Sequence, residues 1–291
     1  MIALLRTLRP QQWVKNVFVG APLVFARHLT DCSYLWREAV AVLAFCMLSG
    51  AVYSFNDVLD VESDRAHPTK KFRPIAAGAL SERAALITSA VLAVVALGAC
   101  LALHWQLAVW GALYLTLNVG YSVKLKHVAF VDVLLIASFF LLRVLAGAAA
   151  IAVPASEWLL ACSGLLALYL ALGKRAHELA WAQTSGQETT TTRAALAGYR
   201  LSTLRIAMFT VGVATSAAYV AYTLDHDTVT KFSTDRLVYS APFVVLGLVR
   251  FAYLALWRPK DESPTEAMLR DPWFLLDLVV ATATVLYIIY G

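Results

Sequence analysis

Residues 84–103 read AALITSAVLAVVALGACLAL, an apolar run without one charged side chain. Strands of globular proteins usually have fewer than about ten residues, whereas about 20 apolar residues let a helix cross the hydrocarbon core of a bilayer. This run is therefore expected to form a membrane-spanning helix. Because comparable runs recur along the chain, the same expectation extends to them.

The composition of the whole chain is that of a membrane protein. Of its 291 residues, 60 % are hydrophobic and 15 % are charged, whereas soluble domains have about 45–50 % apolar and about 25 % charged residues. This composition excludes a disordered chain, a coiled coil and a disulfide-rich scaffold. The formal net charge of +5 comes from residues between hydrophobic runs rather than from one basic face, so nucleic acid is not an expected partner.

Nine apolar runs predict an all-α, polytopic membrane protein: a bundle of about nine transmembrane helices with cytoplasmic cap loops, in a single domain over residues 1–291. The predicted spans are 13–27, 38–56, 84–103, 106–122, 129–152, 157–173, 204–223, 237–257 and 272–290. The first span has the weakest pattern, because Lys15 and Asn16 interrupt its start.

Lysine and arginine predict the orientation of these spans. Most of the 24 basic residues lie in the N-terminal segment and in alternate connections, chiefly 57–83, 174–203 and 258–271. By the positive-inside rule, these segments face the cytoplasm and the C-terminus lies outside. Long polar connections are also where functional residues usually lie. We therefore expect a protein of the inner cell membrane whose active site faces the cytoplasm.

A group of carboxylates follows the second predicted span, in the stretch NDVLDVESD of residues 56–64. If that helix continues, the spacing puts its three aspartates on one face. Their repulsion is relieved by Mg²⁺, which in proteins takes one or two carboxylates together with substrate phosphates. A solvated acidic helix end is the alternative. The predicted catalytic and metal-binding residues are Asn56, Asp57, Asp60 and Asp64.

Basic residues follow the carboxylates directly. They are Arg65, His67, Lys70, Lys71 and Arg73. A metal site beside cations suits a polyphosphate, because the metal and the cations share the phosphate charge. Arg73, which precedes Pro74, is the best candidate ligand, whereas Lys70 and Lys71 are equally well explained as ordinary cytoplasmic charges.

The stretch NDVLDVESDR…HPTKKFRPIAAGALS (residues 56–81) resembles the NDxxDxxxD…P…K…RPI…G motif of the UbiA superfamily of intramembrane prenyltransferases. The resemblance implies a nine-helix fold with Mg²⁺ bound to a diphosphate substrate above a lipid-accessible cavity. Most members join a prenyl diphosphate to an aromatic acceptor and have a second aspartate-rich helix near span six. Here that place reads GKRAHELA (173–180), with one carboxylate and two cations, so the chain departs from the pattern.

Further segments resemble the decaprenyl-phosphate phosphoribosyltransferase branch of that superfamily. They are LRPQQWVKNVFV (8–19), YSVKLKHVAFVDV (121–133), FLLRVLAG (140–147) and LGKRAHEL (172–179). The resemblance implies a pentosyltransferase that moves 5-phosphoribose from phosphoribosyl pyrophosphate (PRPP) to a polyprenyl phosphate lipid, releasing pyrophosphate, for cell-envelope polysaccharide synthesis. The alternative is a prenyltransferase that joins a prenyl diphosphate to an aromatic acceptor. A transporter is a third hypothesis, which the polar residues at the helix ends disfavour.

Two anionic substrates repel each other, and cations from several cytoplasmic segments would reduce this repulsion. The predicted substrate-binding residues are Lys15, Arg73, Tyr121, Lys124, Lys126, Arg143, Lys174 and Arg175. Other roles remain open: Lys15 and Tyr121 could anchor the chain at the membrane interface. Lys174 and Arg175 could instead pair with Glu178 on the same helix.

Arg143 lies inside the fifth predicted span, 11 residues after Asp132 and so about 16 Å deeper. A charge at that depth is expensive and must face the bundle interior or a wet cavity. Arg143 therefore either contacts a phosphate, directly or through Asp132, or clamps helices together. The sequence is also compatible with a homo-oligomer.

Overall fold

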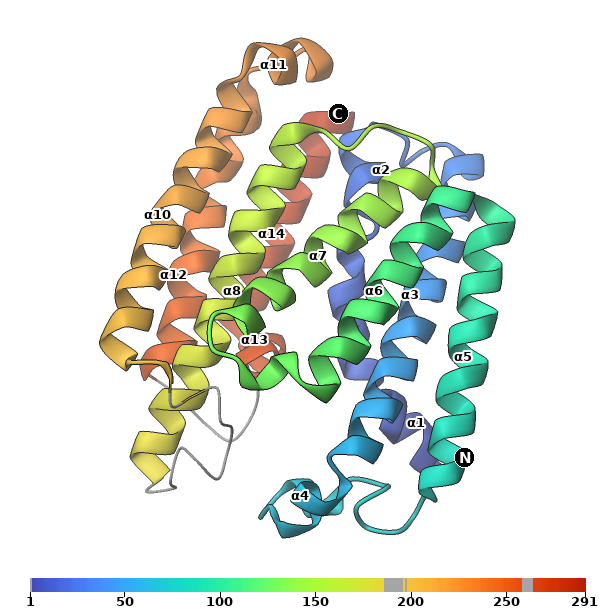
Figure 1. Ribbon diagram of the computed structural model, residues 1–291. Coiled ribbons are helices and arrows are strands. Elements are labelled where there is room, and N and C mark those ends of the chain that lie inside the picture. The colour runs from blue at the N-terminus through green and yellow to red at the C-terminus, as the bar shows by residue number, and fades with distance from the viewer. Residues whose placement is uncertain (1, 186–195, 197, 258–263) are drawn as a thin grey trace. The chain divides into compact units, whose positions relative to one another are not determined.

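The computed structural model describes residues 2–185, 196, 198–257 and 264–291, and every regular element in these ranges is a helix (Figure 1). The all-α prediction is confirmed for this part of the chain. The contacts divide the chain into two compact units. Unit 1 comprises residues 1–125 and 139–155, and unit 2 comprises residues 126–138 and 156–291. The expectation of a single domain over 1–291 stays a prediction.

Unit 1 is built around one long helix, α3. Its elements are α1 (Ile2–Leu8), the 3-10 helix η1 (Pro10–Phe18), α2 (Ala21–Phe25), α3 (Cys32–Leu59), α4 (Val61–Ala66), η2 (Lys70–Phe72), α5 (Glu82–Leu103), α6 (Trp105–Val123) and the later turns of α7 (Val131–Ala150). Helix α3 packs against α5, α6 and α1. Its buried positions include Ala41, Ala44, Gly50 and Ala51, and small residues let membrane helices approach closely.

Unit 2 contains the first turns of α7 together with the C-terminal half of the chain. Its further elements are α8 (Glu157–Ser185), α10 (Leu201–Leu224), α11 (His226–Phe232), η5 (Arg236–Ser240), α12 (Ala241–Trp257), α13 (Pro264–Arg270) and α14 (Pro272–Tyr290); η3 (Leu125–His127) lies at the unit boundary. Helix α8 packs against α10 and α12. A Cβ at Gly173 of α8 would overlap the Phe251 ring of α12, so this close packing requires glycine.

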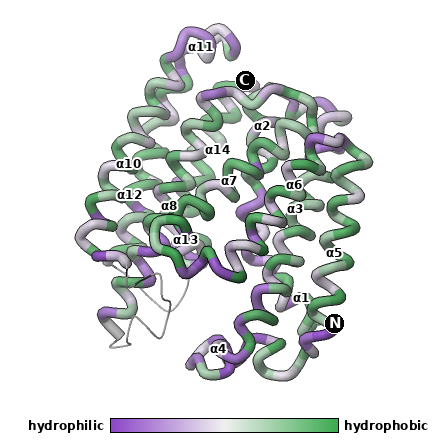
Figure 2. The backbone as a smooth tube through the Cα atoms, in the orientation of Figure 1, coloured by the Kyte–Doolittle hydropathy of each residue, from purple (hydrophilic) through white to green (hydrophobic). Residues whose placement is uncertain are grey.

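Seven described helices are long and apolar enough to cross a membrane. They are α3, α5, α7, α8 (as Glu157–Gln183), α10, Arg236–Trp257 and α14. Figure 2 shows hydrophobic residues along α5, whereas the short helices α4 and α11 are mainly hydrophilic. A multi-pass membrane protein is therefore supported, but the predicted count of nine spans is not confirmed.

Two of the nine predicted spans account for the difference. The prediction of one helix over 13–27 is wrong, because η1 ends at Phe18 and α2 begins only at Ala21. Gly20 precedes α2 and Pro22 lies in its first turn, where proline is tolerated because the amide hydrogen that it lacks would have no partner within the helix. Proline cannot continue a preceding helix, so the chain breaks here. The predicted span 106–122 exists as the continuous helix α6, and its crossing of the membrane stays a prediction.

The boundary predicted after the sixth span is also wrong. Helix α8 does not end at residue 173 but continues to Ser185, so Lys174 and Arg175 lie on a helix rather than in a loop. The remainder of the predicted loop 174–203 is described only in part, since residues 186–195 and 197 lie outside the described residues.

Candidate active site

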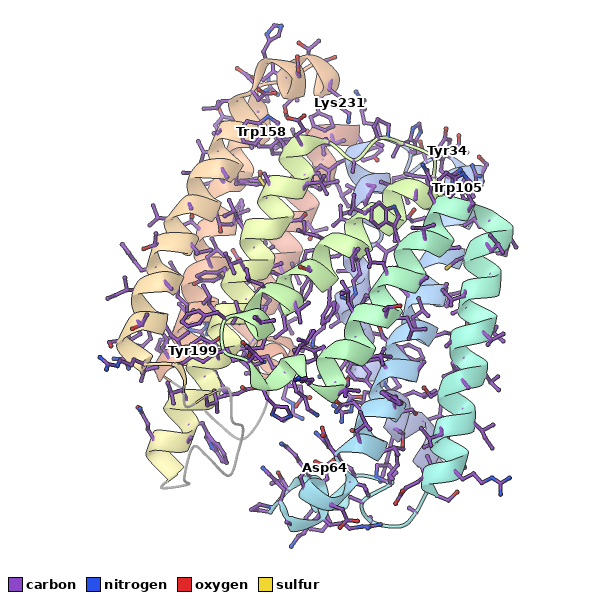
Figure 3. All side chains as sticks on the ribbon, viewed as in Figure 1. Tyr34, Asp64, Trp105, Trp158, Tyr199 and Lys231 are labelled. Atoms are coloured by element: carbon purple, nitrogen blue, oxygen red, sulfur yellow. The ribbon has the colours of Figure 1, made fainter. Side chains whose placement is uncertain are left out.

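The acidic motif does not lie on one continuous helix. Helix α3 ends at Leu59, and α4 begins at Val61 after a junction at Asp60. Asp57 therefore lies in the last turn of α3 and Asp64 on α4 (Figure 3). The side chain of Asn56 donates a hydrogen bond to Asp60 Oδ2 at 2.9 Å. The expectation of three aspartates on one continuing helix face is thus wrong.

Arg73 nevertheless brings two of the aspartates together. Its Nη1 atom lies 3.2 Å from Asp57 Oδ1 and 2.6 Å from Asp64 Oδ2. Both carboxylates are buried, with 2 % and 3 % of each residue exposed. We call Asp57 and Asp64 the acid pair. One guanidinium group shared by two buried carboxylates keeps the acid pair in a fixed place.

The residues after Arg73 explain its position. Ile75 is buried against Val61 of α4 and Ala85 of α5, which anchors the connection between these helices. The amide of Ala77 donates to the Arg73 carbonyl at 2.8 Å. Gly78 has a φ of +74°, a left-handed conformation that glycine adopts readily. The RPIAAG stretch thereby forms a compact turn that presents Arg73 to the acid pair.

Arg9 is a second cation on the acid pair. Its Nη2 atom lies 2.5 Å from Asp57 Oδ1, and its guanidinium group lies over the Tyr53 ring, 5.2 Å from the centroid. The Arg9 backbone is left-handed, with φ 51° and ψ 62°, which is uncommon for a residue other than glycine. Arg9 is not among the site residues predicted from the sequence. Its position before Pro10 was the local signal, because helices usually end before a proline and the chain can then turn.

The acid pair and its two arginines suit a divalent cation that also contacts phosphate. Within the described residues, no group of three or more His, Cys, Asp or Glu side chains could hold a metal ion. Mg²⁺, however, is commonly held by one or two carboxylates while substrate phosphates complete its coordination. Asp57 and Asp64 fit that pattern. The arginine side chains retain 23 % and 26 % exposure, so both can reach a ligand.

Arg143 has the contacts of an interhelical clamp in unit 1. Its Nε donates to Asn16 Oδ1 at 2.8 Å, its Nη1 to the Phe139 carbonyl at 2.9 Å, and its Nη2 to the Tyr114 hydroxyl at 2.9 Å. The guanidinium group also lies over the rings of Tyr114 and Phe140. These contacts join η1, α6 and α7, as the structural alternative predicted. A substrate-binding role for Arg143 stays a prediction.

Unit 2 contains a second cluster of an arginine and acidic residues. Arg175 Nε lies 2.6 Å from Asp132 Oδ2, and both side chains are fully buried. Arg175 also pairs with Glu178, which confirms the pairing weighed from the sequence. The Tyr199 hydroxyl donates to Asp132 Oδ1 at 2.6 Å and accepts from the Phe130 amide at 2.6 Å. Figure 3 shows Tyr199 near the start of α10.

Burial, assisted by the hydrogen bond to Asp132, raises the pKa of Tyr199 above its ordinary value. Tyr199 therefore remains a hydrogen-bond donor throughout the physiological pH range. Asp132 is thus bound by Arg175 and Tyr199, the contacts of a closed structural cluster.

The other predicted substrate-binding residues are distributed over both units. Lys15 on η1 is half-buried, Tyr121 on α6 contacts the Phe139 ring edge-on at 5.8 Å, and Lys124 follows α6 and is exposed. Lys126 is buried and Lys174 is half-buried, and both belong to unit 2. Their contact with substrate stays a prediction.

Comparisons with known proteins identify relatives of this chain. A Mycolicibacterium smegmatis protein named decaprenyl-phosphate phosphoribosyltransferase is 37 % identical over 237 residues, 80 % of this chain and 71 % of that protein. The protein of the same name from Mycobacterium tuberculosis is 36 % identical over 290 residues, 96 % of this chain and 92 % of that protein.

A solved structure shows the fold. The UbiA homologue from Archaeoglobus fulgidus bound to DMAPP and Mg²⁺ matches with a TM-score of 0.71 at 14 % identity, covering 98 % of this chain and 97 % of that one. Residues 17–276 of this chain match the UbiA prenyltransferase family. Because the match spans most of its length, this chain is a transferase that belongs to the UbiA prenyltransferase family.

Proposed function

We propose that this protein transfers 5-phosphoribose from PRPP to the phosphate of a polyprenyl phosphate, with release of pyrophosphate, in a Mg²⁺-dependent reaction. The observation behind the proposal is the buried acid pair held by Arg9 and Arg73. The two relatives named decaprenyl-phosphate phosphoribosyltransferase, each more than a third identical, support the choice of donor and acceptor.

The acid pair suits the chemistry of such a transfer. Displacement at the anomeric carbon of the ribose leaves negative charge on the departing pyrophosphate, and stabilising that charge is the main task of the site. Asp57 and Asp64 would hold Mg²⁺, which when bound supplies Lewis-acid stabilisation of the diphosphate. The attacking lipid phosphate is already an anion at neutral pH, so no strong general base is required.

The arginines of the site have a second task under this proposal. Guanidinium groups bind phosphate oxygens in a bidentate manner, and those of Arg9 and Arg73 are partly exposed. In the absence of substrate they neutralise the acid pair, and they can turn towards phosphate oxygens when a donor binds. Arg9 and Arg73 can thus pair either with the acid pair or with the phosphate groups of the substrate.

Further cations would reduce the repulsion between the two anionic substrates. We assign this role to Lys15, Tyr121, Lys124, Lys126 and Lys174, with Tyr121 as a hydrogen-bond donor. Metal binding by Asn56 and Asp60, which bond to each other, stays a prediction. By the positive-inside rule, the basic residues beside the acid pair favour a site at the cytoplasmic face of the inner membrane.

The direct test offers purified protein two donors. With Mg²⁺, labelled PRPP and polyprenyl phosphate, we expect a labelled lipid product. Labelled product only from a prenyl diphosphate and an aromatic acid would identify a prenyltransferase instead. Glu62→Gln is the matched control, because Glu62 lies on α4 together with Asp64 but its side chain is 83 % exposed; this variant should keep full activity.

A further inference from the structure

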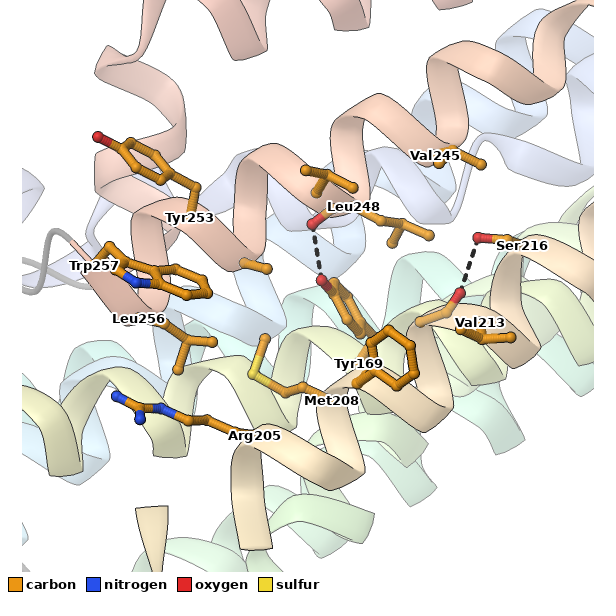
Figure 4. A pocket seen from close by; sticks show the side chains of 14 residues that line it. Tyr169, Arg205, Met208, Val213, Ser216, Val245, Leu248, Tyr253, Leu256 and Trp257 are labelled. Carbon is orange, nitrogen blue, oxygen red and sulfur yellow. Dashed lines mark hydrogen bonds between the residues drawn. The ribbon is translucent and has the colours of Figure 1, made fainter. Parts of the chain in front are cut away.

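An apolar groove runs between α10 and α12 in unit 2, with Tyr169 of α8 beneath it (Figure 4). Its volume is about 730 Å³. Gly212 and Ala252, which have little or no side chain, line the groove and help to make room for a ligand. Phe209 on its edge is 74 % exposed, so the groove opens on the surface of the helix pair. In a membrane, such a groove is filled by hydrocarbon.

The polar groups in the depth of the groove are already satisfied within the protein. The Tyr169 hydroxyl donates to the Leu248 carbonyl at 2.8 Å, and the Ser216 hydroxyl donates to the Gly212 carbonyl at 2.9 Å (Figure 4). These hydroxyl groups therefore have no hydrogen left to donate to a polar ligand. Most of the groove accordingly suits an apolar chain.

One end of the groove differs from the rest. Arg205, Tyr253 and Trp257 gather there, whereas Val213 and Ser216 lie towards the other end (Figure 4). Arg205 is in the second turn of α10, and Trp257 is the last residue of α12. Tryptophan and arginine at helix ends are typical of the membrane–water interface. The groove thus begins at the interface and runs into the hydrocarbon region.

Arg205 offers a charge that the described part of the chain does not neutralise. It is exposed, and no described carboxylate contacts it. Arg250 of α12, by contrast, is held by Asp271 through two bonds of 3.0 and 2.7 Å. A phosphate group at the interface would therefore find its guanidinium partner in Arg205.

The length of the groove indicates what kind of chain it holds. Along α10, the 11 residues from Arg205 to Ser216 rise about 16 Å at 1.5 Å per residue. One leaflet of a bilayer is about half of the roughly 30 Å hydrocarbon core. The groove therefore matches the chain of a lipid in a single leaflet, whereas a polyprenyl chain of many isoprene units would extend far beyond it.

We propose that this groove binds an anionic phospholipid, with its phosphate at Arg205 and an acyl chain between α10 and α12. The site is separate from the acid pair in its residues, and it does not depend on the proposed reaction. A bound lipid of this kind fills the space between α10, α12 and α8 and so stabilises unit 2 in the membrane.

The test measures lipid bound to the delipidated full-length protein in detergent by native mass spectrometry. Phosphatidylglycerol is the anionic probe and phosphatidylcholine the zwitterionic one. We expect wild type to retain phosphatidylglycerol about fivefold more than phosphatidylcholine, because the choline cation offsets the phosphate charge that Arg205 would bind, and one basic residue contributes about 1 kcal/mol. Arg205→Gln should abolish this preference. Arg236→Gln, an exposed arginine before α12, should preserve it.

A second variant tests the chain rather than the headgroup. Ala252→Phe fills the groove and should lower retention of both phospholipids, with transferase activity measured in parallel to verify folding. An unchanged preference in Arg205→Gln, or unchanged retention in a folded Ala252→Phe, would overturn the proposal. Displacement of phosphatidylglycerol by equimolar polyprenyl phosphate would reassign the groove to the acceptor lipid.

Discussion

Two clusters of arginine and aspartate, one in each unit, differ in stoichiometry and exposure. In unit 1, Asp57 and Asp64 share Arg73, and both arginines of the cluster remain about one-quarter exposed. In unit 2, Asp132 and Arg175 are fully buried and face each other directly, and Tyr199 closes the cluster. The same residue types therefore form two kinds of site.

The difference indicates which cluster can bind a ligand. A fully buried ion pair cannot release a charge without a large desolvation penalty. The fully buried pair of unit 2 is of this kind, so we assign it to structure. The acid pair of unit 1 has fixed carboxylates and partly exposed cations, an arrangement in which the cations can be exchanged for a ligand.

The largest expected effect is on activity, from removing one charge of the acid pair. Asp64→Asn keeps the size of the side chain but weakens the hold on Mg²⁺, so transfer from PRPP should fall about 10²- to 10³-fold. Thermal unfolding should change little, because Arg73 still pairs with Asp57. Activity within tenfold of wild type would show that the acid pair is not the reaction centre.

A large loss of stability, by contrast, is expected in unit 2. Asp132→Asn leaves the buried Arg175 charge without its fully buried partner, which should cost about 3–5 kcal/mol. The double variant Asp132→Leu, Arg175→Met should recover most of this loss, because it removes both members of the fully buried ion pair and leaves only the partly exposed Glu178 without Arg175. Thermal unfolding of both variants measures the difference. A folded double variant that no longer binds PRPP would instead support the predicted substrate contact of Arg175.

A smaller effect is expected from the hydroxyl that closes this cluster. Tyr199→Phe removes the donor to Asp132 and the acceptor of the Phe130 amide, which should cost about 1–3 kcal/mol of stability. The KM for PRPP should not change, because Tyr199 is not among the residues assigned to substrate binding. A raised KM with unchanged thermal stability would place Tyr199 in substrate binding.

The smallest expected effect is a change in melting temperature, and it tests the role of Arg9 and Arg73. Mg²⁺ alone should raise the melting temperature hardly at all, since Arg9 and Arg73 already neutralise the acid pair. Mg²⁺ together with PRPP should raise it clearly, by linkage between binding and folding. A large shift with Mg²⁺ alone would mean that the metal displaces the arginines without help from phosphate.

The fold class could be predicted from the sequence, because a long apolar run pairs its backbone polar groups inside a bilayer by forming a helix. The prediction from the sequence was wrong where a helix breaks locally. One such break is at Gly20, before α2, and Pro22, in the first turn of α2. The prediction was also wrong at Asp60, where α3 ends although the helical spacing continues into α4. Helix periodicity alone cannot reveal such a break.

The candidate site was predictable in its acids and in Arg73, which lie in one short stretch. Arg9 was not, because 48 residues separate it from Asp57 and only tertiary packing brings them together. Arg175 was expected among the substrate-binding cations, and its full burial against Asp132 depends on α8 continuing past residue 173. The spacing of residues along the sequence does not reveal contacts between segments that are far apart in the chain.

The most direct test of the central claim is the binding of PRPP measured by isothermal titration calorimetry, with Mg²⁺ and with EDTA. We expect wild type to bind PRPP only with Mg²⁺, and ribose 5-phosphate, which lacks the diphosphate, to bind far more weakly. The double variant Asp57→Asn, Asp64→Asn should lose this binding while remaining folded. An unchanged Kd in that variant, or tight binding in EDTA, would contradict the account.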